Sequence, residues 1–143
     1  MLSFQRLDVY QRAIEFLALA IEIVEALPRG HAQRGEQLIN SAESTVRNIA
    51  EGAGRWSQLD SSKHYQIARG EAMESASSLD VLKVRNLVTP ERYERGIQLL
   101  EGVVGMLTKM IAPSKVATPF KAPSKSTATS TAASKSTFTR DRR

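Results

Sequence analysis

The stretch TPERYERGIQLLEGVVGMLTKMI, residues 89–111, decides the fold. It opens with a helix start signal, because Thr89 can cap the helix with its hydroxyl, Pro90 suits the first helical position and Glu91 places an acid in the first turn. Pro113 then stops the helix. Between these ends, apolar side chains recur at spacings of 4, 3, 4, 3 and 4, the seam of a helix bundle, at Tyr93, Ile97, Leu100, Val104, Leu107 and Ile111.

The first segment of the chain carries two apolar stripes at helical spacing. The first stripe consists of Phe4, Leu7, Tyr10, Ile14, Leu17, Ile21 and Val24. The second consists of Phe16, Leu19, Ile23 and Leu27, and Pro28 ends the segment. Two stripes make an apolar face wider than the core of one bundle requires, so this helix indicates a protein that self-associates.

Two more helices are expected between these segments. The second runs from about residue 32 to 51 and is ended by a pair of glycines, and the third is capped by Ser57 or Asp60. Their expected inward residues are Leu38, Ala42, Thr45 or Val46, Ile49 and Ala53, then Leu59, Ile67, Ala68, Ala72, Ala76, Leu79 and Leu82. No convincing strand alternation appears, so the sequence predicts an all-α, antiparallel up-down-up-down four-helix bundle over residues 1–113.

Composition excludes several classes of protein. The 143-residue chain has 20 Lys and Arg, 15 Asp and Glu, two His and no Cys. Without Cys there can be no disulfide, thiolate metal site or cysteine nucleophile. No apolar run approaches the roughly 20 residues of a membrane span, and the N-terminus lacks the order of a secretory signal. We therefore expect a cytoplasmic protein that makes no use of a membrane.

The excess positive charge belongs to the C-terminal end. Residues 1–113 contain 13 basic and 14 acidic side chains, a net charge of −1, whereas residues 114–143 contain seven basic and one acidic, a net charge of +6. The same end is rich in Ser and Thr and has few large apolar side chains. It can bury too little apolar surface to offset a backbone entropy of about 1–2 kcal/mol per residue, so a disordered basic tail is predicted.

No arrangement of residues indicates catalysis. His31 and His64 have no partner at metal-binding spacing, so we expect neither a metal site nor a cofactor, and both are interpreted as surface residues. The sequence contains no nucleophile elbow, Ser-x-x-Lys motif or phosphate-binding glycine loop. We therefore expect that the protein is not an enzyme.

One polar constellation stands out at the end of the second expected helix. It consists, at helical spacing, of Asn48, Glu51 or Gly52, and Arg55. Glu51 and Arg55 are placed for an i, i+4 ion pair. One interpretation is a structural clamp, in which Asn48 and Glu51 satisfy backbone donors of the neighbouring helix. The other is a binding site for a ligand or a partner.

Four glycines interrupt the interiors of the expected helices, namely Gly70, Gly96, Gly102 and Gly105. Each costs about 0.5–1 kcal/mol relative to Ala. Three of them lie in one helix, which favours close backbone approach, within the bundle or between subunits, over tolerated weakness.

Several short sequence motifs make this chain resemble a known protein family. Asn-Ile-Ala-Glu-Gly occupies residues 48–52 and is followed by Gly-Arg at 54–55, while Leu-Asp-Val-Tyr-Gln occupies 7–11 and Ile-Ala-Arg-Gly occupies 67–70. Over about residues 4–112 the chain resembles a bacterial four-helix-bundle family. That family was first noticed in intervening sequences of large-subunit ribosomal RNA genes, and it includes the accessory variability determinant of diversity-generating retroelements.

The resemblance implies a homopentamer in which five bundles form a barrel around a central channel. In the retroelement relatives the barrel is basic, binds nucleic acid and partners a reverse transcriptase. In this chain the candidates for nucleic-acid contact at the connection between the third and fourth helices are Arg85, Arg92 and Arg95. The tail adds Lys115, Lys121, Lys125, Lys135, Arg140, Arg142 and Arg143.

These observations predict a non-enzymatic, homo-oligomeric scaffold or adaptor that associates with RNA or DNA through its basic residues. The alternative is a structural oligomer that binds a protein partner, with the tail serving solubility or regulation. In that case the arginines of the connection are ordinary solvated side chains.

Overall fold

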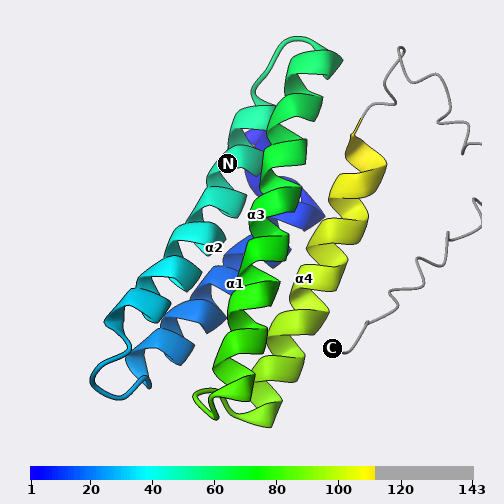
Figure 1. The fold of residues 1–143 in the computed structure, drawn as a ribbon. Helices are drawn as coiled ribbons and strands as arrows, with labels where there is room; N and C mark the ends of the chain where they lie inside the picture. The colour runs from blue at the N-terminus through cyan, green and yellow to red at the C-terminus, as the bar shows by residue number, and fades with distance from the viewer. Residues whose placement is uncertain (112–143) are drawn as a thin grey trace, which may run out of the picture. The chain divides into compact units, whose positions relative to one another are not determined.

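The computed structural model describes residues 1–111. These residues form a short 3-10 turn and four α-helices without a strand, which confirms the all-α class. In the colour order of Figure 1 the elements are η1 (Ser3–Arg6), α1 (Asp8–Glu25), α2 (Ala32–Ala53), α3 (Gln58–Val84) and α4 (Pro90–Met110). The predicted tail, residues 114–143, lies outside the described residues, so its disorder and the boundary that separates it from the bundle stay predictions.

Each helix packs on its neighbour in the chain, and α4 also packs on α1. α1 and α3 lie diagonally across the bundle, as do α2 and α4, because neither pair is in contact. Consecutive helices are joined at alternate ends of the bundle (Figure 1). The α1–α2 side is therefore opposite the α3–α4 side. None of the helices within residues 1–111 combines the length and the apolar composition needed to cross a membrane.

Two of the helices begin at the hydroxyl residues that the sequence offers as caps. Ser57 Oγ accepts a hydrogen bond from the Asp60 amide at 3.1 Å, so Ser57 rather than Asp60 caps α3. Thr89 caps α4 in the same way, because its hydroxyl accepts from the Arg92 amide at 3.3 Å. The predicted start of α4, with Pro90 in the first turn, is confirmed.

α1 buries two members of its second stripe and leaves two members of its first stripe in solvent. Phe16 and Ile23 are each 1% exposed, whereas Ile14 and Ile21 of the first stripe are 40% and 42% exposed. Ala13 and Ala20 are also buried, and their small side chains let the neighbouring helices approach closely. Leu7, Tyr10, Leu17 and Val24 of the first stripe are partly buried against the core, so the core uses part of both stripes and leaves Ile14 and Ile21 over. The buried residues of α1 are Val9, Ala13, Phe16, Ala20 and Ile23.

The inward residues predicted for α2 are buried as far as Ile49. In α3 the prediction is wrong at Leu59 and Ile67, which are 66% and 49% exposed. The ring of Tyr65 is buried instead and packs against Gly52 of α2. Ile67, two residues further along the helix, points away from this contact because successive helical residues are about 100° apart. The spacing of apolar residues favours large aliphatic side chains as the inward ones, and it does not predict a contact with another helix.

The buried side of α4 is wider than its predicted seam, because α4 packs between α1 and α3. Leu100 and Leu107 of the seam are buried, and its other members are half-buried. The rest of the buried side consists of Gly96, Leu99 and Val103.

Two serine hydroxyls meet in the core between α2 and α3. Ser41 Oγ lies 2.7 Å from Ser75 Oγ and donates to the Leu38 carbonyl at 3.1 Å, so Ser75 is the donor in the serine pair. Thr45 donates to the Ser41 carbonyl at 2.8 Å. Within the described part of the chain every buried side-chain polar atom has a hydrogen-bond partner, so none adds an uncompensated desolvation cost.

One of the four interior glycines, Gly96, lies in a closely packed place of the kind that the sequence predicts, because a Cβ there would lie 2.7 Å from a methyl carbon of Leu79. A Cβ on Gly102 would lie 2.8 Å from a guanidinium nitrogen of Arg12, but the end of that flexible side chain can move aside. A Cβ on Gly70 or Gly105 would meet nothing within 4 Å. These last two glycines therefore have no packing role among residues 1–111.

Replacing Leu79 by Ala should lower the free energy of unfolding by about 2–5 kcal/mol, because this fully buried side chain leaves a cavity. Val81→Ala is the matched control, since Val81 is on the same helix but 45% exposed, and it should cost about 0.5 kcal/mol or less. Urea denaturation followed by circular dichroism measures both variants. Equal losses would contradict the buried side assigned to α3.

Candidate functional site

The end of α2 and the start of α3 are joined through the imidazole of His64. His64 Nδ1 lies 3.3 Å from Asn48 Oδ1 and 3.2 Å from Glu51 Oε2. Both oxygens are acceptors, so Nδ1 must donate, which fixes the tautomer of the neutral ring. The Asn48 side-chain amide is itself held in place, because its nitrogen donates to the Ser44 carbonyl at 2.9 Å.

Gly52 lets the two helices approach each other at the same level. A Cβ at this position would lie 2.6 Å from the Tyr65 ring and 3.2 Å from His64 Cβ. An aromatic ring cannot bend away as the tip of a flexible side chain can, so only glycine fits here. Burial raises the pKa of the Tyr65 phenol above its ordinary value. We call Asn48, Glu51, Gly52, His64 and Tyr65 the α2–α3 joint.

Asn48 and Glu51 do act as a clamp, but on a different group from the one predicted. They contact the side chain of His64 rather than backbone donors of α3. Arg55 does not belong to the joint, because α2 ends at Ala53 and the Arg55 side chain is exposed, with no hydrogen bond or ion pair to the described residues. The expected ion pair of Glu51 with Arg55 is thus wrong, and Glu51 pairs with His64 instead.

His64 is the member of the joint that sequence reasoning missed. It was interpreted as a surface residue because it follows Lys63 near the start of a helix. Its side chain is only 20% exposed and lies against α2. The one signal available was its position beside Tyr65, since a buried aromatic residue brings its neighbours to the edge of the interface.

The joint holds two helices together and offers one ring nitrogen, His64 Nε2, that is not engaged by Asn48 or Glu51. A histidine oriented by a carboxylate can serve as a general base through that nitrogen. Within residues 1–111 no group of three or more His, Asp or Glu side chains is placed to hold a metal ion. The contacts made by the joint favour the clamp interpretation of the constellation.

The three arginines predicted at the α3–α4 connection do not form one basic surface. Arg95 reaches α1, where it pairs with the carboxylate of Glu15. Arg85 follows the last residue of α3 and Arg92 lies in the first turn of α4, so both stay at the connection. The seven cations predicted in the tail lie outside the described residues.

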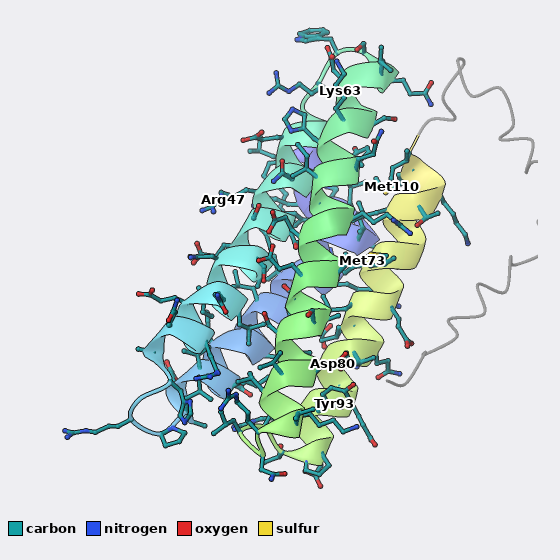
Figure 2. The ribbon with its side chains drawn as sticks, in the orientation of Figure 1. Arg47, Lys63, Met73, Asp80, Tyr93 and Met110 are labelled. Atoms are coloured by element: carbon teal, nitrogen blue, oxygen red, sulfur yellow. The ribbon has the colours of Figure 1, made fainter. Side chains whose placement is uncertain are left out.

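Other charged groups at this connection are engaged with one another. Tyr93 donates a 2.6 Å hydrogen bond to Asp80 Oδ1, and Lys83 Nζ lies 4.2 Å from the centre of the Tyr93 ring. The hydrogen bond to Asp80 raises the pKa of the Tyr93 phenol above its ordinary value. Figure 2 shows Asp80 and Tyr93 close together at this end of the bundle. The connection is therefore held by charges of both signs.

Gly52→Ala should lower the free energy of unfolding by about 1–3 kcal/mol, because the added Cβ overlaps the Tyr65 ring. Gly70→Ala, with open space around the added carbon, should instead raise it by about 0.5–1 kcal/mol through helix propensity. Urea denaturation measures both changes. If Gly52→Ala also stabilises the protein, the close contact at the joint is contradicted.

Comparison with a solved structure agrees with the fold. The chain is similar to the crystal structure of a protein of unknown function from the S23 ribosomal protein family of Bacteroides thetaiotaomicron, with a TM-score of 0.67 and 23% sequence identity. The match covers 73% of this chain and 99% of that chain. At this identity the similarity shows the fold alone.

Sequence comparison gives the family. No curated protein matches the chain. The sequence model of the 23S rRNA-intervening sequence protein family matches residues 5–109, a span that includes the whole α2–α3 joint and nearly all of the four helices. The chain therefore belongs to the 23S rRNA-intervening sequence protein family, in agreement with the resemblance carried by its motifs.

Proposed function

We propose that the protein is a non-enzymatic, homo-oligomeric scaffold of the cytoplasm that associates with nucleic acid through its basic residues. Each protomer is an antiparallel up-down-up-down bundle, and the copies join through apolar faces of the bundle. The observation that carries this proposal is the half-exposed first stripe of α1.

This stripe has the spacing of a helix-pairing seam. We call this line the α1 seam, and its members follow one another at spacings of 4, 3, 4 and 3. They are Tyr10, Ile14, Leu17, Ile21 and Val24. None of the five is buried, although all are large and apolar. The period of 3.5 keeps such a line of side chains facing a partner helix. Tyr10, Leu17 and Val24 are partly buried against the bundle core, whereas Ile14 and Ile21 are 40% and 42% exposed. Apolar side chains left partly open to water at this spacing are available as a contact surface.

A second apolar surface lies on the opposite side of the bundle. It is a groove of about 310 Å³ between α3 and α4, lined chiefly by Met73, Ile97, Val104 and Gly105. Figure 2 shows Met73 on the side of α3 that faces α4. Gly105 costs its helix about 0.5–1 kcal/mol and has no packing role among the described residues. The close approach of a helix from another copy would use it.

Two different surfaces on opposite sides favour a head-to-tail assembly. In a symmetric dimer each surface would meet its own copy, and one of the two would remain open in both subunits. When the α1 seam of one copy enters the α3–α4 groove of the next, both surfaces are covered in every copy once the ring closes. The family resemblance implies a ring of five.

The nucleic-acid contact of the proposal rests on residues 114–143, because the preceding part of the chain is nearly neutral. A ring gathers one basic segment from each subunit, and linked weak contacts raise affinity by about 10²–10⁴. Arg85 and Arg92 add positive charge at the α3–α4 connection. Arg95 adds little, because Glu15 neutralises it.

A structural oligomer that binds a protein is the second candidate, and the α3–α4 groove is the observation that favours it. An amphipathic helix of another protein, such as the reverse transcriptase that the resemblance implies, fits an apolar groove between two helices. The basic tail then serves solubility or regulation.

Wild-type protein should elute as an oligomer in size-exclusion chromatography with light scattering, and the double variant Ile14→Glu, Ile21→Glu as a monomer. Assembly would otherwise bury two unpaired carboxylates. Val84→Glu is the control, since Val84 is 82% exposed at the end of α3 and should leave the mass unchanged. A monomeric wild type, or an oligomer that the double variant does not disturb, contradicts self-association through the α1 seam.

The groove needs its own variant. Gly105→Trp fills the α3–α4 surface and should give the same monomer as the changes on α1. If Gly105→Trp leaves the oligomer intact, the groove takes no part in self-association. That result would support the second candidate function, in which the groove binds a protein partner.

Fluorescence anisotropy of a labelled single-stranded RNA, titrated across a salt series, tests the nucleic-acid contact. Full-length protein should bind with a slope of log K against log salt of about −5 when all seven cations of one tail meet phosphates. The chain cut after residue 113 should lose most of that affinity and slope. Absence of binding at low salt by the full-length protein would reject nucleic acid as the partner.

A further inference from the structure

Trp56 lies in the connection between α2 and α3 and is fully exposed, with a relative exposure of 104%. Tryptophan is well buried on average, because its large ring gains most from leaving water. The local fold does not depend on this ring, since Ser57 supplies the cap of α3 and Gly54 ends α2. An exposed indole without a structural role is available to a partner.

The charges around Trp56 narrow the choice of partner. Lys63 lies 3.9 Å from Asp60 and stays largely in solvent at this end of the bundle (Figure 2). Glu51, another acid near the connection, is held in the α2–α3 joint. The Arg55 side chain is exposed and makes no ion pair with the described residues, so an unpaired positive charge adjoins the indole in the chain.

An exposed aromatic face and an unpaired guanidinium on consecutive residues suit a ligand that combines a planar base with a phosphate. We propose that Arg55 and Trp56 form a stacking site for single-stranded nucleic acid, in which an unpaired base stacks on the indole and the guanidinium contacts a phosphate of the same strand. This inference rests on the proposed function, because it names where on the bundle the nucleic acid is held.

A protein anchor is less well supported at this place. In protein interfaces a tryptophan hot spot is surrounded by residues that exclude water from it. The neighbours of Trp56 in the chain are Ser57 and Gln58, both polar, and only Leu59, which is 66% exposed, adds apolar surface nearby in sequence. One aromatic ring and one cation next to it in the chain are sufficient to bind a nucleic-acid base and its phosphate. They provide too little apolar surface to anchor a protein partner.

The proposed ring would repeat this site. Cyclic symmetry keeps every bundle pointing the same way along the axis, so all copies present the α2–α3 connection at one end of the ring. One strand can then stack on several copies in turn, and the linked contacts raise its affinity.

Trp56 is the only tryptophan in the sequence, so its fluorescence reports on this site alone. A short oligouridylate, titrated into the full-length protein, should quench that fluorescence with the same midpoint as the anisotropy of the labelled oligonucleotide. Trp56→Ala should weaken binding about 5- to 150-fold, the range expected for the loss of one base stack, and Trp56→Phe should retain most of it. Circular dichroism checks that both variants keep their helix content.

Two controls separate stacking from charge. Arg47 is an exposed arginine part-way along α2 that pairs with Glu43 at 3.4 Å (Figure 2). Arg55→Ala should reduce both the affinity and its salt dependence, whereas Arg47→Ala should change neither. Inorganic polyphosphate supplies negative charge without bases, so it should leave Trp56 fluorescence unchanged.

Three results would overturn the inference. Oligouridylate binding with unchanged Trp56 fluorescence and unchanged affinity in Trp56→Ala would remove the stacking site and leave the proposed function standing. Equal quenching by polyphosphate would show that the connection senses charge rather than bases. No binding of oligouridylate at low salt, by anisotropy or by fluorescence, would overturn the stacking site and the nucleic-acid part of the proposed function together.

Discussion

The ring of Tyr65 lies where a side chain at position 52 would have to be, so α2 and α3 can meet at this level only over a glycine. That contact sets how closely the two helices pack, and it brings His64 against Asn48 and Glu51. α2 ends one residue later, and the chain must then reach α3 within residues 54–57. The indole in this short connection does not pack on the helices and is fully exposed. The shape of this end of the bundle thus depends on the missing side chain of one residue.

α1 illustrates a different constraint, because its apolar surface is wider than the core of one bundle can bury completely. The side that it buries carries Ala13 and Ala20, which allow close packing, and the side that it leaves open carries the branched Ile14 and Ile21. Covering what remains exposed of each isoleucine would contribute about 1 kcal/mol. These contributions would favour the contact with a second copy that the proposed self-association requires.

Sequence pattern was sufficient where the chemistry is local. Helix starts follow from hydroxyl caps, and both Ser57 and Thr89 act within three residues of their own position. Pattern fails where a residue on one helix decides the orientation of another. Ile67 is apolar and correctly spaced, yet it faces outward while Tyr65 makes the contact with α2. The role of His64 could not be predicted for the same reason, since its partners lie on the preceding helix and its position beside Tyr65 does not identify them.

The connections between consecutive helices are only four to six residues long, and helices that follow one another in the chain also pack together. Most contacts are therefore local in sequence, and helical bundles of this kind fold within microseconds to milliseconds. Encounter with a second copy is a bimolecular event whose rate depends on concentration. In the proposed oligomer, a newly made chain would complete its own bundle long before that encounter, and the α1 seam would spend the interval in water. The length of that interval would be set by how much of the protein the cell makes rather than by the fold itself.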